Sequence, residues 1–160
     1  MEYKKNTLYI FADGACRNNQ EKDNLGGYAA VLRYNDEFAE HSGVDANTTN
    51  NKMELCAIVL ALGKVKDKSK PTIVTMDSQY VVKGINEWAE KWKKNGFKNA
   101  KGEEIKNFSY WRWLLELVDM FDSIQFVHCK GHEDNEGNNR ADELCNIAMD
   151  EYLAKKGKVI

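Results

Sequence analysis

The sequence has few of the features that mark segmented, secreted or membrane-spanning proteins. Its 160 residues include a single proline and no proline-rich or low-complexity stretch, which argues against a linker between domains. No apolar run approaches the roughly 20 residues needed to cross a bilayer. Residues 1–6 lack the apolar centre of a signal peptide. We therefore expect one domain over residues 1–160, ending in a short basic tail from about 154, with no membrane contact and a cytoplasmic location.

The sequence also lacks an excess of charge of either sign. Lys and Arg number 23 and Asp and Glu number 25, which gives a formal net charge of −2. This balance excludes a strongly basic nucleic-acid-binding chain, so any basic surface must be local. Hydrophobic residues make up 42% and charged residues 30%, which is the composition of a globular protein and not of a disordered one.

The four cysteines form neither a CxxC pair nor the dense framework of a small disulfide-bonded protein. Cys129 and His132 have the C-x-x-H spacing of some zinc sites, and Cys145 follows them in the chain. A structural zinc site normally takes four ligands. His128 is a poor fourth ligand, because alternation along a strand would point it away from Cys129. A zinc-stabilised structural module therefore stays a minor alternative.

Hydrophobic periodicity and turn residues predict alternating strands and helices. The expected strands cover residues 7–13, 26–34, 37–44, 72–77 and 123–129, and the expected helices cover 50–66, 78–94, 108–121 and 138–153. Short connections place the first three strands in an antiparallel meander. Helical crossovers are right-handed, which makes the later strands parallel to the first. The predicted fold is α/β, with a five-stranded mixed sheet and helices on both faces.

Four acidic residues stand at the boundaries of these elements, namely Asp13, Glu54, Asp77 and Asp142. Each has an ordinary structural explanation when it is taken alone. Asp13 and Gly14 form a turn-like pair, and Asp77 could cap the helix that follows it. Glu54 and Asp142 each lie three residues after an asparagine, in the pattern of a capping box. Acidic residues at helix starts are routine, so no single one of them identifies a site.

Taken together, the four carboxylates indicate a metal site. If the first and fourth strands are parallel neighbours, Asp13 and Asp77 emerge side by side at one edge of the sheet. Glu54 and Asp142 can then point from two helix N-termini to the same place. Clustered carboxylates repel one another strongly unless cations lie among them, and hard oxygen ligands suit magnesium or manganese. Two such ions about 4 Å apart form a clamp that is used to cleave phosphodiesters.

Seven short segments of the sequence carry a family resemblance. They are residues 11–16, 26–28, 48–55, 77–81, 92–94, 130–132 and 138–144. In letters they read FADGAC, GGY, TTNNKMEL, DSQYV, WKK, KGH and NNRADEL. Each is a weak motif alone, but all occur in order at the spacing of one family. With them the sequence resembles ribonuclease H of type 1, the enzyme that cuts the RNA strand of RNA–DNA hybrids, from about residue 7 to residue 149.

The resemblance implies a catalytic role for the four carboxylates and for one histidine. Asp13, Glu54, Asp77 and Asp142 match the family's metal ligands, with Asp13 between two Mg²⁺ ions, which Mn²⁺ can replace. Glu54 would hold one ion and orient the attacking water, and Asp142 would hold the other. His132 matches a histidine of a mobile loop that assists proton transfer or product release. Histidine titrates near neutral pH, which suits such a role.

The resemblance also implies which residues contact the hybrid. The positions that match minor-groove contacts are Cys16, Asn19, Asn50, Asn51 and Gln79. Amide side chains can both donate to and accept from the 2′-hydroxyls displayed in that groove. Thr49 and Asn107 match a pocket that holds a DNA phosphate.

A basic protrusion of the family, which grips the DNA strand, is matched by the segment that follows the fourth strand. Its matching residues are Trp88, Trp92, Lys93 and Lys94. The ordinary structural explanation is a solvated helix face for the lysines and a core position for the tryptophans. Phosphate contacts of this kind supply affinity without sequence information.

We therefore expect a monomeric endonuclease that hydrolyses RNA in RNA–DNA hybrids and leaves 5′-phosphate and 3′-hydroxyl ends. A catalytically silent hybrid-binding domain is an alternative, against which the four intact carboxylates argue. A ribonuclease domain cut from a reverse transcriptase is another alternative with the same chemistry. The self-contained length and the basic protrusion favour a free cellular enzyme.

Overall fold

A computed structural model describes residues 2–18, 23–130 and 135–157 of the protein. Its sheet has five strands in the order β3-β2-β1-β4-β5. The strands are β1 (Leu8–Arg17), β2 (Leu25–Tyr34), β3 (Glu37–Ala46), β4 (Thr72–Met76) and β5 (Ile124–His128). The first three strands pair antiparallel, β4 runs parallel to β1, and β5 runs parallel to β4. The predicted five-stranded mixed sheet is therefore confirmed.

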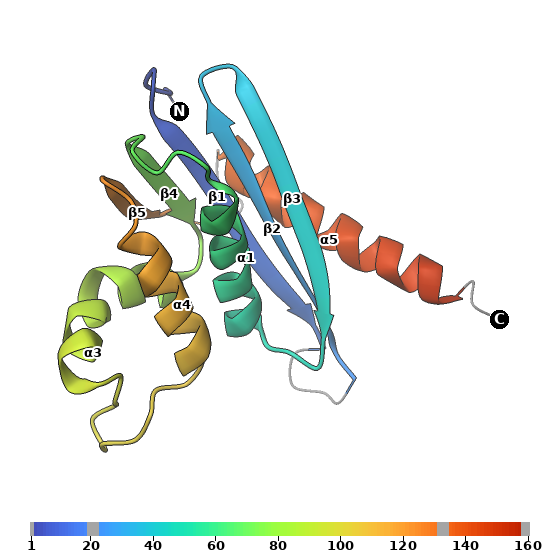
Figure 1. The fold of residues 1–160 in the computed structure, drawn as a ribbon. Coiled ribbons are helices and arrows are strands. Elements are labelled where there is room, and N and C mark those ends of the chain that lie inside the picture. The colour runs from blue at the N-terminus through green and yellow to red at the C-terminus, as the bar shows by residue number, and fades with distance from the viewer. Residues whose placement is uncertain (1, 19–22, 131–134, 158–160) are drawn as a thin grey trace.

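Helices cover both faces of this sheet, as predicted. They are α1 (Asn50–Lys64), α2 (Gln79–Lys83), the π-helix η1 (Gly84–Trp88), α3 (Ala89–Asn95), α4 (Phe108–Val118) and α5 (Glu136–Gly157). Figure 1 shows α1 in front of the sheet and α5 behind it, while α3 and α4 stand to one side. None of the helices within the described residues is both long and apolar enough to cross a membrane.

Alternation along β1 supplies both layers of the core. Leu8 and Ile10 belong to the large apolar cluster on the side of α1, α2 and α4. Tyr9 and Phe11 belong to a smaller cluster that includes Ala141 of α5. Successive side chains of a strand point to opposite faces, so one strand can bury two apolar surfaces. The polar residues that follow in β1 are thereby held between two packed layers.

The first strand does not stop at Asp13 and Gly14, where a turn was predicted. It continues to Arg17, and Gly14 pairs with Tyr28 inside the β1–β2 ladder. Helix α1 approaches the strand closely at this point, because a Cβ atom on Gly14 would lie 2.3 Å from the carbonyl carbon of Met53. The glycine is thus required by close packing and not by a turn.

The helix caps differ from those predicted for the acidic residues. Thr49 caps α1 and its hydroxyl accepts a hydrogen bond from the Lys52 N–H, so Glu54 lies in the second turn outside any capping box. The cap of α2 is Ser78, not Asp77. Helix α5 begins two residues earlier than expected, which moves Asp142 into its second turn. Glu54, Asp77 and Asp142 are therefore not helix caps.

The single helix expected over residues 78–94 is three consecutive segments, α2, η1 and α3. The π-helical segment begins at Gly84, where an added Cβ would lie 2.1 Å from the indole of Trp111. The predicted stop is confirmed, since Gly96 follows Asn95 with a φ of 75°. At the other end of the chain, residues 154–157 continue α5, although a frayed tail was expected there.

Candidate active site at the ends of the parallel strands

An open cavity of about 440 Å³ lies where β1 and β4 meet the starts of α1 and α2. Its lining residues are Asp13, Gly14, Ala15, Asn50, Asn51, Glu54, Asp77, Ser78, Gln79, Tyr80 and Asp142. All four predicted carboxylates and three of the predicted amide side chains are in this set. Such crevices outside the carboxyl ends of parallel strands are the usual ligand sites of α/β sheets. We call this hollow the acidic cavity.

The backbone of Gly14 holds two of the carboxylates together. Its N–H donates to Asp13 Oδ1 at 3.0 Å and to Glu54 Oε1 at 3.1 Å. This shared donor is available because Gly14 lets α1 come close to β1. Ligand oxygens from Asp13, Glu54 and Asp77 lie within 4.8 Å of one another. Asp142 lines the same cavity from α5 but lies outside this tight group.

Burial and crowding raise the pKa values of two of these carboxyl groups. The pKa of Asp13 is raised from the usual 3.8 to about 8, first by burial and then by the charge of Asp77. The pKa of Glu54 is raised well above 4.5, first by burial and then by the charge of Asp13. The Gly14 N–H acts on Glu54 in the opposite sense, because it stabilises the charged form. Without a cation, Asp13 therefore keeps its proton near neutral pH.

A divalent cation fits this arrangement. Glu54 is 8% exposed, and its Oε2 atom is buried without a hydrogen-bond partner, while Oε1 is held by Gly14. A buried acceptor without a donor is costly unless an ion or a water satisfies it. Oxygen-only ligands from three carboxylates suit Mg²⁺ or Mn²⁺ and not zinc. Among the residues that the structure describes, no cysteines and histidines come together in a group that could hold a metal ion.

The proposed zinc ligand Cys145 has a different place in the structure. Its buried thiol donates to the carbonyl oxygen of Asp13 at 3.2 Å. Burial, followed by the negative charge of Asp13, raises the pKa of this thiol. A thiol kept protonated in this way is a poor zinc ligand. Cys145 instead ties α5 to β1 directly behind the acidic cavity.

The predicted groove contacts lie on the rim of the acidic cavity. The N–H of Cys16 donates to Asn50 Oδ1 at 2.7 Å, which joins the end of β1 to the start of α1. Asn51 and Gln79 are exposed and line the cavity from two different helices. Asn19 lies outside the described residues. The three described amide side chains thus stand beside the carboxylates.

The two predicted phosphate contacts already take part in local structure. The hydroxyl of Thr49 caps α1. The side-chain amide of Asn107 donates to the Tyr80 hydroxyl at 3.1 Å, and the indole N–H of Trp111 donates to the same hydroxyl at 2.8 Å. Tyr80 also lines the acidic cavity, so it connects the cavity to Asn107. Reasoning from sequence did not single out Tyr80, although it belongs to the DSQYV motif.

The residues predicted to grip the DNA strand differ in how much of them reaches solvent. Trp88 is 38% exposed, and its ring centroid lies 5.8 Å from that of Trp92. Trp92 is partly buried, with its centroid 5.0 Å from that of the fully buried Trp111. Lys93 lies 3.1 Å from Asp119, and Lys94 is exposed. We call residues 84–98 the protrusion.

Of the two histidines considered from the sequence, the structure describes one. His132, the predicted proton carrier, lies outside the described residues. His128 was considered only as a zinc ligand, and its Nε2 atom lies 3.2 Å from the carbonyl oxygen of Asp77. It therefore supports the peptide at the end of β4. The signal for this role was its position at the end of a strand that pairs with β4.

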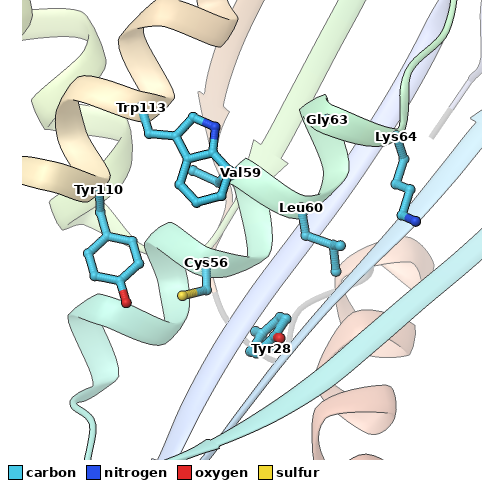
Figure 2. Close-up of a pocket in the computed structure, with 8 residues that line it drawn as sticks. All are labelled: Tyr28, Cys56, Val59, Leu60, Gly63, Lys64, Tyr110 and Trp113. Atoms are coloured by element: carbon cyan, nitrogen blue, oxygen red, sulfur yellow. The ribbon is translucent and has the colours of Figure 1, made fainter.

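A second hollow of about 380 Å³ lies between α1, α4 and the sheet (Figure 2). Its walls include Tyr28, Cys56, Leu60, Tyr110 and Trp113. Burial raises the pKa of the Cys56 thiol, which makes the thiol less nucleophilic. This apolar hollow lacks the converging carboxylates of the acidic cavity.

Comparison with known proteins identifies the family of this chain. The chain matches the family model described as RNase H over residues 5–150. It is 42% identical to a ribonuclease H of Francisella philomiragia over 152 residues, which covers 95% of this chain and 97% of the relative. It is 43% identical to a ribonuclease H of Clostridium botulinum over 146 residues, with coverage of 91% and 97%.

Solved structures agree in fold. A foamy viral protease-reverse transcriptase in complex with RNA/DNA hybrid matches with a TM-score of 0.78 at 25% identity, over 89% of this chain and 20% of that one. LC11-RNase H1 in complex with RNA/DNA hybrid matches with a TM-score of 0.68 at 25% identity, over 91% and 99%. LC9-RNase H1, a type 1 RNase H, has a TM-score of 0.75 at 23% identity, over 94% and 75%. With an acidic cavity on this fold and relatives above 40% identity, the chain belongs to the ribonuclease H family.

Proposed function

We propose that this ribonuclease H hydrolyses the RNA strand of RNA–DNA hybrids with two Mg²⁺ ions held in the acidic cavity, leaving 5′-phosphate and 3′-hydroxyl ends. The observation that carries the proposal is the group of Asp13, Glu54 and Asp77 oxygens within 4.8 Å, together with the unpartnered Oε2 of Glu54. Asp142 completes the ligand set from the far wall. Mn²⁺ has the same ligand preference and is an acceptable substitute.

The side chains of the cavity divide the work between them. Divalent ions held there would supply an activated water molecule and would neutralise the charge that develops on the phosphate. Asp13 and Asp77 hold the ions from the adjacent ends of β1 and β4. Glu54 is fixed through Oε1, so its free Oε2 can bind an ion and orient the attacking water. His132 carries the proton to or from this region, because histidine exchanges protons near neutral pH.

Recognition of the hybrid is proposed to divide between its two strands. Asn19, Asn50 and Gln79, with Cys16 and Asn51 beside them, read 2′-hydroxyls of the RNA strand in the shallow minor groove. Solved relatives bound to RNA/DNA hybrid support a hybrid as the ligand.

The DNA strand is proposed to meet a separate surface. Thr49 and Asn107 contact one phosphate, and Trp88, Trp92, Lys93 and Lys94 contact the DNA beyond it. We further propose that the protein acts as a monomer.

The decisive experiment incubates labelled RNA–DNA hybrid, duplex DNA and duplex RNA with the protein, with and without Mg²⁺. We expect cleavage only of the RNA strand in the hybrid, and only when Mg²⁺ is present. A polymerase should be able to extend the 3′ ends of the products. Binding of hybrid without cleavage at any Mg²⁺ concentration would instead identify a silent hybrid-binding domain. A linear dependence of the rate on Mg²⁺ at low concentration, in place of a higher-order one, would argue against two ions.

A further inference from the structure

Asp142 differs from the other three carboxylates in the element that carries it. Asp13 is in β1, Asp77 directly follows β4, and Glu54 is in α1, which packs tightly against β1 at Gly14. Asp142 alone is carried by α5, on the other face of the sheet (Figure 1). Its carboxylate reaches the acidic cavity only if α5 has the right rotation about its own axis. The position of Asp142 therefore depends on what fixes that rotation.

The inner side of α5 contacts the sheet through small residues before Asp142, and through the larger Leu144 and Met149 after it. A Cβ on Gly137 would lie 2.3 Å from the ring of Phe11, and Ala141 is fully buried. Such residues allow a close approach of helix and sheet. These small residues interlock little, and interlocking side chains are what resists rotation of a packed helix. The restraints after Asp142 are Met149, which packs on the sheet, and Asp150, which pairs with Arg17 of β1. The thiol of Cys145 adds one weak hydrogen bond to the carbonyl oxygen of Asp13.

The outer side of α5 is tied to the edge of the sheet by an arginine. Arg140 Nε donates to Glu40 Oε2 at 2.6 Å, and its Nη2 donates to Glu40 Oε1 at 3.1 Å. Its Nη1 donates to Glu143 Oε1 at 2.7 Å within the same helix. Glu40 belongs to β3, so the two-pronged contact joins elements 100 residues apart. A fork of this kind fixes orientation as well as distance.

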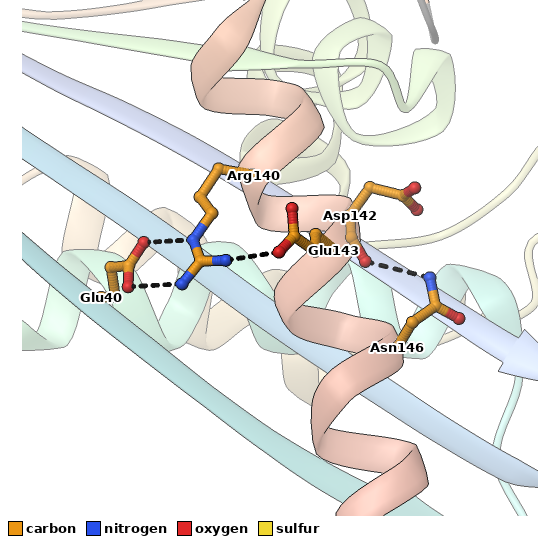
Figure 3. A network of polar contacts seen from close by, with 5 residues as sticks. All are labelled: Glu40, Arg140, Asp142, Glu143 and Asn146. Carbon is orange, nitrogen blue, oxygen red and sulfur yellow. Dashed lines mark hydrogen bonds and ion pairs between the residues drawn. The ribbon is translucent and has the colours of Figure 1, made fainter.

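Arg140 and Asp142 lie on nearly opposite sides of the helix. Two positions along an α-helix correspond to a rotation of about 200°. Figure 3 shows the Arg140 side chain directed to Glu40 on one side of α5 and the Asp142 side chain directed away on the other. Fixing the arginine on β3 thus fixes the direction in which the carboxylate projects.

We propose that Glu40 and Arg140 are positioning residues that set the rotation of α5 and so hold Asp142 at the acidic cavity. The inference rests on the proposed metal-binding role of Asp142. The contact acts through geometry, because an exposed ion pair adds little to global stability. Loss of the contact should therefore weaken metal binding clearly, while the melting temperature changes little.

The test replaces Glu40 by Gln in the full chain and titrates the metal-free protein with Mg²⁺ in a calorimeter. We expect the affinity of the weaker ion to fall about 10-fold, as is usual for residues that orient a metal ligand. Cleavage of hybrid should return to the wild-type rate at saturating Mg²⁺. The melting temperature without metal should stay within about 4 °C of wild type. An unchanged Mg²⁺ affinity would overturn the inference.

Glu143→Gln is the matched control. Like Glu40→Gln, it removes one negative charge that pairs with Arg140, and Glu143 is next to Asp142 in the chain. It leaves the contact between α5 and β3 in place. We expect its Mg²⁺ affinity to equal that of wild type. Equal losses in Glu40→Gln and Glu143→Gln would show an effect of charge alone and would overturn the positioning role.

Arg140→Lys tests the fork itself. It keeps the positive charge but removes the planar group that grips both oxygens of Glu40. We expect it to weaken Mg²⁺ binding as Glu40→Gln does. Wild-type affinity in this variant would contradict a role for the two-pronged geometry.

Asp142→Asn separates this inference from the proposed function. We expect the variant to bind Mg²⁺ more weakly by itself, and addition of Glu40→Gln to it should cause no further loss, because both changes act through one carboxylate. No effect of Asp142→Asn on Mg²⁺ affinity would refute the metal-binding role. A loss in Asp142→Asn to which Glu40→Gln adds in full would refute the positioning role alone.

Discussion

The acidic cavity and the protrusion handle charge in opposite ways. In the cavity, Asp13 is 3% exposed and Glu54 is 8% exposed, and both face further carboxylates in place of cations. In the protrusion the lysines are exposed, and Lys93 lies near two acidic partners, 3.1 Å from Asp119 and 3.8 Å from Glu90. One region holds buried charges of one sign, and the other holds solvated charges of both signs.

This difference decides what each region can bind. Buried like charges must be neutralised by protons or by cations, so the cavity selects small ions of high charge. Exposed lysines lose little hydration and their charges are screened by salt, so we expect the protrusion to bind only a polyanion, and weakly. Chemistry is therefore expected to depend steeply on single residues of the cavity. Binding at the protrusion is expected to depend on many small contributions.

The largest expected effect is in the cavity. Asp77→Asn removes one charge and almost no volume, and because Ser78 is the cap of α2, no helix cap is lost. We expect hybrid cleavage at saturating Mg²⁺ to fall by about 10³-fold or more, as when a main electrostatic contact of a transition state is removed. Repulsion in the cavity is relieved, so a melting curve without metal should show equal or higher stability.

Asp122→Asn is the control for this change, because Asp122 is an exposed aspartate after α4 and does not line the acidic cavity. Its cleavage rate should match wild type. A rate within a few-fold of wild type for Asp77→Asn would contradict the catalytic use of the cavity.

A smaller effect is expected for the residue that moves a proton. His132→Ala should lower the cleavage rate about 10²-fold but leave measurable activity, since general acid–base assistance is helpful but not essential. The rate should be measured between pH 5.5 and 8.5. Profiles of the same shape and height for wild type and variant would refute the role of His132.

The free energy of unfolding should depend on pH because of the raised pKa of Asp13 in the cavity. In the unfolded chain Asp13 loses its proton near pH 4, but in the folded protein its pKa is raised to about 8. Between these values the folded state binds more protons, so the free energy of unfolding contributed by this group falls as pH rises. Urea unfolding in EDTA from pH 4.5 to 8.5 measures the decline, and Asp13→Asn should flatten it. A curve that rises through this range in wild type and variant alike would contradict the raised pKa.

The smallest expected effects are in the protrusion, where the two lysines differ. The charge of Lys93 is offset by Asp119, whereas the structure gives Lys94 no ion pair among the described residues. Lys94→Ala should weaken hybrid binding about 3-fold and lower the slope of log affinity against log salt by about 1, the share of one phosphate contact. Lys93→Ala should change the affinity and the salt slope by less. Binding by Asp77→Asn protein in fluorescence anisotropy avoids cleavage, and equal effects of the two lysines would contradict this ranking.

Much of the fold was predictable because its signals are local. The apolar residues of β4 and the alternation in β1 mark strands wherever they pack. Gly96 marks the end of α3 by its left-handed conformation. The four carboxylates could be named from motifs in the sequence, and the structure brings all four to one cavity.

Several local signals pointed to the wrong structure because distant contacts decided the outcome. The pair Asp13 and Gly14 suggested a turn, yet the glycine serves the close approach of α1 to an unbroken strand. Residues 78–94 suggested one helix, yet Gly84 begins a π-helical turn against Trp111, a residue of another helix. Propensity describes a segment alone, whereas packing depends on its neighbour.

The sequence by itself determined the strands and helices in outline, the carboxylates and the family. Tertiary structure alone decided that Gly14 donates to both Asp13 and Glu54, that Lys93 is offset by Asp119, and that Glu40 grips an arginine 100 residues away. Contacts of this kind follow from the order of strands in the sheet and the rotation of helices upon it. Neither quantity is encoded by any one segment, because each is set by the packing of the whole core.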